Sequence, residues 1–431
     1  MTKILIAPIE IAGQYRNLAL AIRSLGHGCE YYTFYSHLFA YGGDIGSNPL
    51  PRTLRHISSM REGRIRIYQH FLTISFELIR LLFFLWAIFR YDAFIFGFGI
   101  TLLRGNCDLY ILKLLGKKTI VNMSHGSDMT PDYIDGALLN LEGQMPAAAE
   151  LSNSCIKKLK RVRRIENNAA IIIGSPLSSS YFASKPFVSI FSIGRVCQSH
   201  YSSYSSPTAS ITERHQAIKI LHVPSHAPGK GSALIEATIG ELIDAGYMID
   251  FIKLSGVPND IVLRHIRECD LVVDQLYSDL PMSGIACEAA FFAKPTLLAG
   301  YELESLCSIV PTSDLPPTII CHPDQFVSTL EHLIKNPYLL KQHACAAFEF
   351  VNSRWNPHQV ASRYMQLITH SEIPIHWWHN PKILTNVHGY GLSEAKLKEN
   401  ILSLVDCCGP NSLCLSHRPD LLDAMISFAR R

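Results

Sequence analysis

The sequence predicts an α/β protein of two domains, each built on a parallel sheet, followed by a small C-terminal helical appendage. Three observations predict this. The chain has 431 residues, which is too long for one ordinary hydrophobic core. Hydrophobic residues make up 48% of it and charged residues 17%, so the chain can bury a large core. Short apolar runs typical of buried strands alternate with segments of helical period, and this alternation occurs as two separate series.

The first series opens with a strand over 3–7, a loop that contains Gly13, and a helix over 17–25. A strand, a loop with a glycine and a helix in this order are typical of the start of a nucleotide-binding α/β domain. The other elements that we expect in this half are strands over 29–34, 93–96, 119–123 and 170–173, and helices over 71–89 and 156–166.

The second series follows a polar, Ser-rich stretch over 197–216, which has no apolar periodicity and is expected to be a linker. We therefore place the N-terminal domain at 1–196, the C-terminal domain at 217–365 and the appendage at 366–431. The appendage carries a helix over 393–405 and no motif that indicates its role. The C-terminal domain is expected to hold strands over 218–223, 248–254, 271–273 and 296–298, and helices over 233–245, 261–268, 284–292, 325–334 and 337–351.

Charge and cysteine content argue against several classes of function. The formal net charge is +3 and no long Lys/Arg run occurs, which argues against a nucleic-acid-binding protein. The twelve cysteines lack the spacing of a zinc site, so we expect no metal and no cofactor. For the one cluster, Cys407, Cys408 and Cys414, buried thiols are a better explanation than a metal or redox site. The first eight residues predict a strand and a turn rather than a signal peptide, so a cytoplasmic protein is expected.

The segment 52–90 combines basic and apolar residues. Basic side chains beside exposed apolar ones favour an anionic membrane surface, so peripheral contact with the inner face of the cell membrane is one hypothesis. The alternative is that the helix over 71–89 packs on the sheet. Its uninterrupted apolar run, Leu81 to Phe89, falls short of the roughly 20 residues that cross a bilayer. The helix is preceded by Arg52, Arg55, Arg61, Arg64 and Arg66.

The first candidate site is the segment 222–232, HVPSHAPGKGS, between a strand and a helix of the second series. Ligands bind at such positions in open α/β sheets, and a helix N-terminus there offers N–H groups and a positive dipole end to an anion. Lys230 adds a full positive charge suited to a diphosphate leaving group. Pro224 stands where a P-loop has its first glycine, and a Gly/Pro turn with a solvated lysine is the alternative.

The second candidate is Glu288, which stands one turn into the nearly apolar helix over 284–292. A carboxylate facing the cleft there can accept hydrogen bonds from the vicinal hydroxyls of a ribose. Gly284 at the start of the same helix can present N–H groups to a phosphate. The alternative is an ordinary solvated glutamate.

The third candidate is the segment Ser124-His125-Gly126-Ser127-Asp128, directly after the strand over 119–123. A histidine at the carboxyl end of a strand can project into a cleft, where it donates a hydrogen bond to a sugar or moves a proton. Asp128 can orient this histidine or hold acceptor hydroxyls. A structural histidine beside helix-capping Ser and Asp residues is the alternative.

Together these segments resemble the GT-B glycosyltransferases, and specifically the glycosyltransferase 4-like group, over roughly residues 1–365. The strongest likeness is HVPSHAPGKG…DLVVDQLYSDLPMSGIACEAAFFAKP, which looks like the donor-binding half of that group. The stretch His125-Gly126-Ser127-Asp128 is similar to a His-Gly-x-Asp stretch of the acceptor-side domain. The resemblance implies two facing Rossmann-like domains, the N-terminal one on the acceptor side.

The resemblance also implies roles for individual residues. Lys230 would contact the diphosphate, Glu288 the ribose, Gly284 the phosphate backbone and His125 the transferred sugar. The loop that ends at Gly13 resembles the glycine loop beneath the donor phosphates. Members of the group mostly retain the anomeric configuration and need no metal, which agrees with the absence of an Asp-x-Asp sequence here.

Two positions depart from the pattern of the group. Leu280 stands where an acidic residue is often found, with Asp279 beside it. Ser225 replaces an arginine five residues before the lysine, with His226 beside it. Asp279 and His226 are candidates to substitute for the missing groups; otherwise stabilisation of the leaving group rests more on Lys230 and the helix dipoles.

The sequence therefore predicts a cytoplasmic hexosyltransferase. It would move a sugar from a nucleotide-sugar donor to a glycan or lipid-linked acceptor in bacterial surface polysaccharide biosynthesis (lipopolysaccharide, capsule or exopolysaccharide). Two alternatives stay open. One is a GT-B sugar-nucleotide epimerase, which shares the twin domains and needs no acceptor. The other is a non-catalytic GT-B subunit of a polysaccharide assembly complex.

Overall fold

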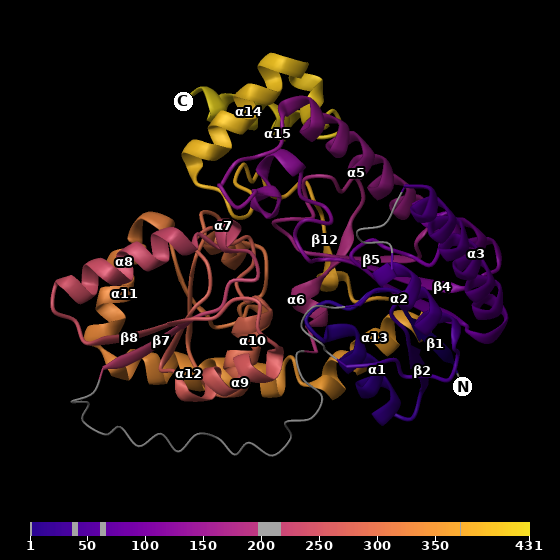
Figure 1. The fold of residues 1–431 in the computed structure, drawn as a ribbon, viewed down its shortest axis with the longest axis horizontal. Coiled ribbons are helices and arrows are strands. Elements are labelled where there is room, and N and C mark those ends of the chain that lie inside the picture. Colours follow the sequence, from indigo (N-terminus) through magenta and orange to yellow (C-terminus); the bar gives the residue numbers. More distant parts are fainter. Residues whose placement is uncertain (1, 37–41, 61–65, 197–216, 371) are drawn as a thin grey trace.

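The computed structural model describes residues 2–36, 42–60, 66–196, 217–370 and 372–431. It has two α/β domains beside one another, with a pair of C-terminal helices standing over the N-terminal domain (Figure 1). The expected fold class, two parallel-sheet domains with a helical C-terminal appendage, is confirmed. The expected linker over 197–216 lies outside the described residues.

The N-terminal sheet has seven strands in the order β12-β6-β5-β4-β3-β1-β2. All neighbours pair in parallel except β12, which is antiparallel to β6. The sequence analysis does not predict β6 and β12, which have three and two residues and show no alternating pattern. The seven strands are β1 (Lys3–Ile6), β2 (Gly28–Tyr31), β3 (Ala93–Gly97), β4 (Lys118–Met123), β5 (Ile171–Gly174), β6 (Phe187–Ser189) and β12 (Trp378–His379).

Helices cover both faces of this sheet, because successive side chains of a strand point to opposite faces. Ile4 and Ile6 of β1 belong to one hydrophobic cluster with helices α1 and α13, whereas Leu5 belongs to the cluster on the other face. The helices of the first face are α1 (Gln14–Ser24) and α13 (Pro357–Thr369), and those of the second are α2 (Leu50–Met60), α3 (Arg66–Arg90), α4 (Asp108–Leu114) and α5 (Ala148–Asn168).

The C-terminal sheet has five parallel strands in the order β11-β10-β9-β7-β8. Helices α8 and α11 pack on one face of it, and α9 and α10 on the other. The strands are β7 (Ile218–His222), β8 (Ile249–Lys253), β9 (Leu271–Val273), β10 (Thr296–Ala299) and β11 (Ile319–Cys321). The helices are α7 (Ala227–Lys230), α8 (Ser232–Asp244), α9 (Asn259–Glu268), α10 (Gly284–Phe291), α11 (Phe326–Lys335) and α12 (Pro337–Ser353).

The chain crosses back to the N-terminal domain after α12. Residues 357–365, which the sequence assigns to the C-terminal domain, belong to α13, and α13 packs against α1 and β4 of the N-terminal domain. The N-terminal domain therefore takes its last helix from the far end of the chain. Periodicity shows which face of such a helix is buried, but not which sheet lies beneath it.

Helix α3 is longer than its apolar run. It is continuous over 25 residues, and by length and composition it could cross a membrane, which corrects the expectation that it is too short. Only 39% of its most apolar window is buried in the protein. Phe76, Phe83 and Phe84 pack on the sheet side, so α3 lies along the N-terminal domain with its opposite face in solvent.

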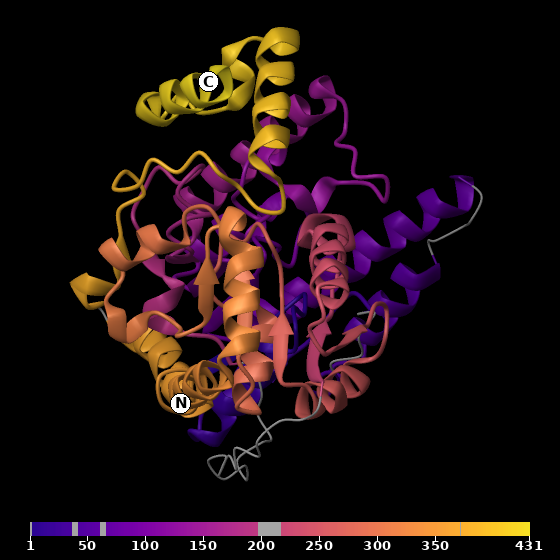
Figure 2. The ribbon, with the colours of Figure 1, turned by 90° about the vertical axis from the view of Figure 1, so that its left-hand side faces the viewer.

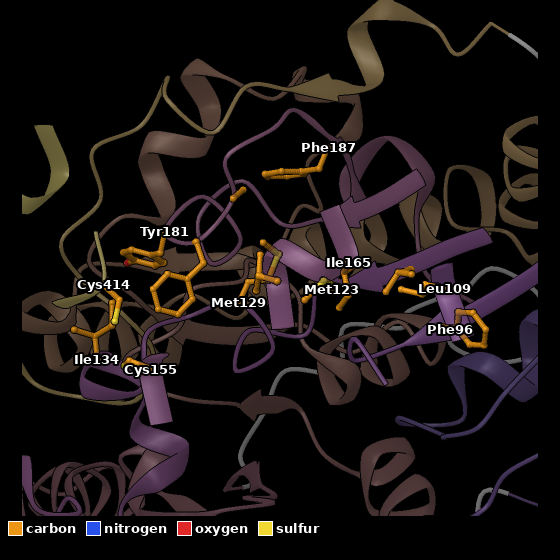
Figure 3. Packing of buried hydrophobic residues seen from close by; sticks show 14 of the residues in the cluster. Phe96, Leu109, Met123, Met129, Ile134, Cys155, Ile165, Tyr181, Phe187 and Cys414 are labelled. Carbon is orange, nitrogen blue, oxygen red and sulfur yellow. The ribbon is translucent and has the colours of Figure 1, made fainter. Parts of the chain in front are cut away.

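The appendage packs on the N-terminal domain. Its helices, α14 (Glu394–Cys408) and α15 (Pro419–Arg430), stand at the top of the molecule in Figures 1 and 2, and α14 packs against α5. Figure 3 shows Cys414 of the appendage near Ile134, Cys155 and Tyr181, and all four are buried in one cluster. The appendage is therefore part of the N-terminal core.

Candidate active site between the two domains

The carboxyl ends of both sheets border one cavity of about 340 Å³. Loops after β1 and β4 form its N-terminal wall, and loops after β7 and β9 form its C-terminal wall. A second cavity of about 280 Å³ has several lining residues in common with the first, so the two are adjacent. The residues common to both cavities are Ile11, Ala12, Ser225, Lys230, Ser283, Gly284 and Glu288. This is the place where open parallel sheets bind ligands.

His125 lines the first cavity, and its side chain is only 6% exposed. Its Nδ1 lies 3.3 Å from Oδ2 of Asp128, and its Nε2 lies 3.3 Å from the hydroxyl of Tyr15. An ionised carboxylate only accepts, so Nδ1 carries the proton and Nε2 is an acceptor. Burial lowers the pKa of His125, although Asp128 opposes this effect, and the ring is therefore uncharged at neutral pH.

Asp128 lies behind His125 and does not line the cavity. Its Oδ2 also accepts a hydrogen bond from the backbone N–H of His125, at 3.3 Å, whereas its buried Oδ1 has no partner. Of the two roles predicted for Asp128, orienting the histidine fits this position, and holding acceptor hydroxyls does not.

Lys230 ends the short helix α7 and lines both cavities. It is 7% exposed, and its Nζ lies 2.6 Å from Oδ1 of Asp274, which follows β9. The alternative reading as a solvated lysine is therefore wrong. The ion pair, which has no net charge, fixes the Lys230 ammonium group where the two cavities meet.

Ser225 and His226 precede Lys230 on the same loop. Ser225 lines both cavities and is exposed. The Nδ1 of His226 accepts from the N–H of Gly229 at 3.2 Å, and its Nε2 lies 3.0 Å from the carbonyl oxygen of Leu139 in the N-terminal domain. A ring that accepts at one nitrogen and donates at the other is the neutral tautomer. His226 therefore does not supply the positive charge of an arginine.

Glu288 is buried at 7% exposure and lines both cavities. Its Oε1 accepts a hydrogen bond of 3.2 Å from Nδ2 of Asn259, the first residue of α9. Burial raises the pKa of Glu288 to about 7, while the bond from Asn259 opposes the shift. The alternative reading as a solvated glutamate is therefore wrong as well.

Gly284 is the first residue of α10 and lines both cavities. The preceding Ser283 caps the helix, because its hydroxyl accepts from the N–H of Ala286 at 3.4 Å. A Cβ at position 284 would stand 3.3 Å from the Cβ of Ala12, so the loop after β1 lies against this helix end. The N-terminal end of α10, with the N–H groups of its first turn, therefore lies between the two domains.

Gly13 does not line either cavity, in contrast to its neighbours Ile11 and Ala12. It adopts a φ of 72° at the N-cap of α1. This left-handed conformation turns the chain from the loop into the helix and costs a glycine little. Gly13 therefore shapes the loop, and Ala12 faces the ligand space.

Asp279 has a more central place in the first cavity than the sequence analysis gives it. Asp279, considered only as a neighbour of Leu280, is 6% exposed and its Oδ2 has no partner. A Cβ at Gly126 would stand 3.4 Å from that oxygen, so the carboxyl group faces the N-terminal wall. Burial, and next to it the charge of Asp135, raises the pKa of Asp279 to about 7.

Arg195 lines the first cavity but is not among the site residues predicted from the sequence. Its Nη2 donates to the carbonyl oxygen of Ser124 at 2.7 Å. Burial lowers the pKa of Arg195, and the nearby carboxyl groups of Asp128 and Asp279 oppose this shift. The signal was present, because Arg195 is the only charged residue in the apolar stretch 187–196.

The described part of the chain holds no group of three or more His, Cys, Asp or Glu side chains that could bind a metal ion. Cys407 and Cys408 are exposed, Cys414 is buried, and all three are free thiols.

No protein-family model and no curated protein matches the sequence. Solved structures match the fold. The spinosyn forosaminyltransferase SpnP covers 86% of this chain and 100% of its own length, at 11% identity and a TM-score of 0.42. Anabaena Alr3699/HepE, in complex with UDP and glucose, covers 85% and 99%, at 11% identity and a TM-score of 0.47. The catalytic domain of starch synthase IV from Arabidopsis thaliana, bound to ADP and acarbose, covers 86% and 99%, at 11% identity and 0.42. At such low similarity, function has to be argued from the site itself.

Proposed function

We propose that this chain is a nucleotide-sugar-dependent glycosyltransferase of the cytoplasm that acts on bacterial surface polysaccharide. One observation carries the proposal. A single cavity is lined by Glu288, Lys230 and the start of α10 from the C-terminal domain and by His125 from the facing domain. A nucleotide sugar consists of a nucleobase, a ribose, a diphosphate and a sugar. We assign Glu288 to the ribose, Lys230 and the start of α10 to the diphosphate, and His125 to the sugar.

The nucleoside belongs at the Glu288 end. The second cavity extends from Glu288 past Asn259 to the apolar side chains of Val257, Val262 and Ile285. Apolar walls suit the face of a nucleobase. Asn259 occupies one oxygen of Glu288, and the other oxygen is available to the two vicinal hydroxyls of a ribose.

The diphosphate belongs at the junction of the cavities. Lys230, which is paired with Asp274, and Arg195 bring cationic N–H donors from the two domains, and α10 begins at Gly284 beside the same space. When the bond between the anomeric carbon and the phosphate oxygen breaks, the diphosphate gains negative charge, and fixed cations and dipoles stabilise it. These groups supply the charge that a metal ion supplies in other transferases, so we include metal independence in the proposal.

The sugar belongs beside His125 and Asp279, which belong to opposite walls of the first cavity. The uncharged His125 ring and the Asp279 carboxyl group can both bond to sugar hydroxyls. For a retaining transfer, the acceptor hydroxyl attacks the anomeric carbon from the face that the diphosphate leaves. The departing phosphate oxygen then takes the hydroxyl proton, which balances the reaction.

The acceptor would be presented at a membrane surface by α3. The outer face of this helix carries large apolar side chains at helical spacing, so they form one stripe. The stripe consists of Phe71, Ile74, Leu78, Leu82, Leu85 and Phe89, with exposed fractions of 65%, 69%, 57%, 48%, 45% and 88%. A helix that packs on a sheet along one face and shows such a stripe on the other fits peripheral contact with the bilayer interface.

One of the arginines before α3 already has a partner within the protein. Both terminal nitrogens of Arg55 lie 2.7 Å from the carboxylate of Asp44. Arg52 is exposed. Arg61 and Arg64 and the side chain of Arg66 lie outside the described residues. The apolar stripe therefore carries the proposed membrane contact, and Arg55 adds little to it.

The test is a thermal-shift screen of the purified protein, in EDTA, against UDP-, ADP-, GDP- and TDP-sugars. A donor raises the melting temperature because it binds the folded state. We expect Glu288→Ala to lose that shift, and the matched control Glu241→Ala, an exposed position on α8, to keep it. If no nucleotide sugar stabilises the wild-type protein, the donor site is refuted and a non-catalytic assembly subunit is favoured.

One observation favours the epimerase alternative. Asp279, with a pKa of about 7, can take up and release a proton in the first cavity, as epimerisation requires. Incubation of the stabilising nucleotide sugar without acceptor separates the two enzymes. Conversion to its epimer identifies an epimerase, whereas transfer that depends on added membrane lipid or glycan identifies the transferase.

A further inference from the structure

The chain between β12 and α14, residues 380–393, which we call the strap, joins the two domains. Figure 2 shows the yellow segment before α14 passing over the orange C-terminal domain. The strap begins at the N-terminal sheet, where Arg418 of the appendage holds it. The Nη1 of Arg418 donates to the carbonyl oxygen of Pro381 at 2.5 Å, and its Nη2 donates to that of Leu384 at 2.8 Å. Arg418 is 1% exposed, so these bonds are shielded from water.

The middle of the strap binds the C-terminal domain through His388. The His388 ring stacks on Tyr301 with 4.5 Å between centroids, and its Nδ1 lies 3.0 Å from Oε1 of Glu302. The backbone carbonyl of His388 accepts a hydrogen bond from the hydroxyl of Tyr181, which belongs to the N-terminal domain. One residue therefore contacts both domains.

The end of the strap also contacts both domains, here through backbone hydrogen bonds. The N–H of Tyr390 donates to the carbonyl oxygen of Ile134 at 3.1 Å, and its carbonyl oxygen accepts from Gly136 at 2.6 Å. The next N–H, of Gly391, donates to the carbonyl oxygen of Tyr277 in the C-terminal domain at 2.7 Å. Adjacent residues are thus bonded to opposite walls of the cavity.

The backbone of the strap lies in direct contact with the backbones of the loop that holds Ile134 and Gly136 and of the loop that holds Gly229. Glycines in the strap make this close approach possible. Gly391 has a φ of 71°, and a Cβ there would stand 2.8 Å from the carbonyl oxygen of Gly229, on the loop that carries Lys230. A Cβ at Gly389 would overlap the carbonyl oxygen of Ile134. No other residue type fits either position without displacing a neighbouring backbone.

Tyr390 is one of the residues that line the first cavity, as are Ala137 and Asp279. It does not line the second cavity, where the nucleoside is assigned. Tyr390 therefore belongs to the part of the site that receives the sugar. A phenol offers one O–H donor and an apolar ring, and both are suited to a hexose.

From these contacts we propose that the strap holds the two domains closed over the cavity, and that Tyr390 on it contacts the transferred sugar. The first half of the proposal is independent of the proposed function. The second half rests on the assignment of a nucleotide sugar as substrate. The C-terminal appendage then has a role, because it anchors a segment that completes the active site.

The closing role is tested by hydrogen–deuterium exchange on the full chain without ligand. We expect slow exchange of the Tyr390 and Gly391 amides in the wild type. Gly391→Ala should accelerate exchange in peptides 132–139 and 226–231, which belong to opposite domains, by about tenfold or more. The matched control is Gly409→Ala, because Gly409 has a φ of 77° in the same appendage but nothing within 4 Å of its Cβ position. This control should leave both peptides unchanged.

A second variant guards against a general loss of folding. His388→Ala removes the ring that stacks on Tyr301 but leaves the backbone bonds of Tyr390, and it should accelerate Gly391 more than Tyr390. His322→Ala, which removes another ring from Tyr301 without touching the strap, is its control. Rapid exchange of the wild-type Tyr390 and Gly391 amides, or equal effects of Gly391→Ala and Gly409→Ala, would overturn the closing role.

The sugar contact is tested by comparing UDP with UDP-glucose, and ADP, GDP and TDP with their hexose forms, by calorimetry. Tyr390→Phe should weaken the nucleotide sugar about three- to tenfold, as expected for one lost hydrogen bond, and leave the nucleoside diphosphate unchanged. Tyr247→Phe, whose hydroxyl bonds to Glu331 on the outside of the C-terminal domain, is the control. Equal weakening of both ligands, or none, refutes the sugar contact. If the wild type binds none of these ligands, both the proposed function and the sugar contact are refuted. The exchange experiment uses no ligand and still decides the closing role.

Discussion

The Nζ of Lys230 lies 2.6 Å from Oδ1 of Asp274, and both groups are buried at the junction of the two cavities. Oδ2 of Asp274 has no partner in the described residues. The pair links the short helix α7 to the loop after β9 and fixes the cation at the place proposed for the diphosphate. Its two members are therefore expected to depend on each other for stability.

Lys230→Met and Asp274→Asn should each destabilise the protein by about 3 kcal/mol, because each leaves a buried polar or charged partner unpaired. The double variant should lose less than the sum of the two, because it leaves neither charge behind. Urea unfolding of the four proteins measures this. Additive losses would show that the pair is not coupled. Lys230→Met and the double variant should also lose binding of a nucleoside diphosphate, whereas Asp274→Asn should keep it.

Glu288 should make donor binding depend on pH. Its pKa of about 7 means that the carboxylate form, which accepts two ribose hydroxyls, grows as the pH rises from 6 to 8. Affinity for a nucleotide sugar, whose diphosphate is esterified at both ends and does not titrate in this range, should rise about tenfold or less over this interval. Glu288→Gln should remove the dependence. A wild-type affinity that is constant with pH would contradict the role of Glu288.

The same pKa makes a prediction for stability. Because the folded pKa of Glu288 is raised above the ordinary 4.5, the folded state binds the extra proton. This proton uptake stabilises the folded state fully below pH 4.5, and the stabilisation is lost as the pH rises through 7. The free energy of unfolding changes by about 1.4 kcal/mol for each unit of difference between the folded and unfolded pKa. The melting temperature of the wild type, relative to that of Glu288→Gln, should therefore fall between pH 5 and 8. A relative melting temperature that rises with pH would contradict the sign.

Asp128 should act through His125. Asp128→Leu leaves Nδ1 of His125 without its acceptor, so the ring proton should move toward Nε2, and nitrogen-15 NMR of the imidazole can detect this. Transfer should fall at least about tenfold while donor binding is kept. Asp128→Asn, whose amide oxygen can still accept, should retain the tautomer and most of the activity. Loss of donor binding in Asp128→Leu would place Asp128 in the donor site instead.

The apolar stripe on α3 should mediate binding to lipid vesicles. Replacing Phe71, Ile74 and Leu78 with serine should abolish most co-sedimentation, because each exposed side chain contributes apolar area to the interface. Leu141→Ser is the control, since Leu141 is 88% exposed on a loop remote from α3 in sequence. Arg55 should contribute little to binding, because it is engaged with Asp44. Unchanged co-sedimentation of the triple variant would remove the membrane hypothesis.

Much of the fold could be predicted from the sequence, because most helices and strands are long enough to show a helical or alternating pattern of apolar residues. Nearly every strand expected from apolar runs is present within one to three residues of its predicted bounds, as at 271–273, where β9 is Leu271–Val273. Three strands were missed, namely β6, β11 and β12, and each has three residues or fewer. The return of α13 to the first domain was missed because amphipathic period does not name the partner of a buried face.

The candidate site could be predicted where a loop or helix follows a strand of a parallel sheet. His125, Lys230, Gly284 and Glu288 all line the first cavity, because loops at the carboxyl ends of parallel strands converge. The role of Gly13 as a ligand contact was not supported, because its backbone turn directs Ala12 inward instead. Sequence alone also leaves open whether a histidine such as His226 is free, since its partner Leu139 belongs to the other domain.

The sequence by itself determined the alternation of strands and helices, the two-domain organisation and the loops that carry the site, because these follow from short-range period and chain order. Only the tertiary structure decided that Arg195, Asp279 and Tyr390 share one cavity. Tyr390 stands 195 positions after Arg195, and it reaches the cavity through a strap held by backbone hydrogen bonds. Backbone bonds and burial leave no mark on residue type beyond a few glycines, so contacts of this kind become visible only when the chain is folded.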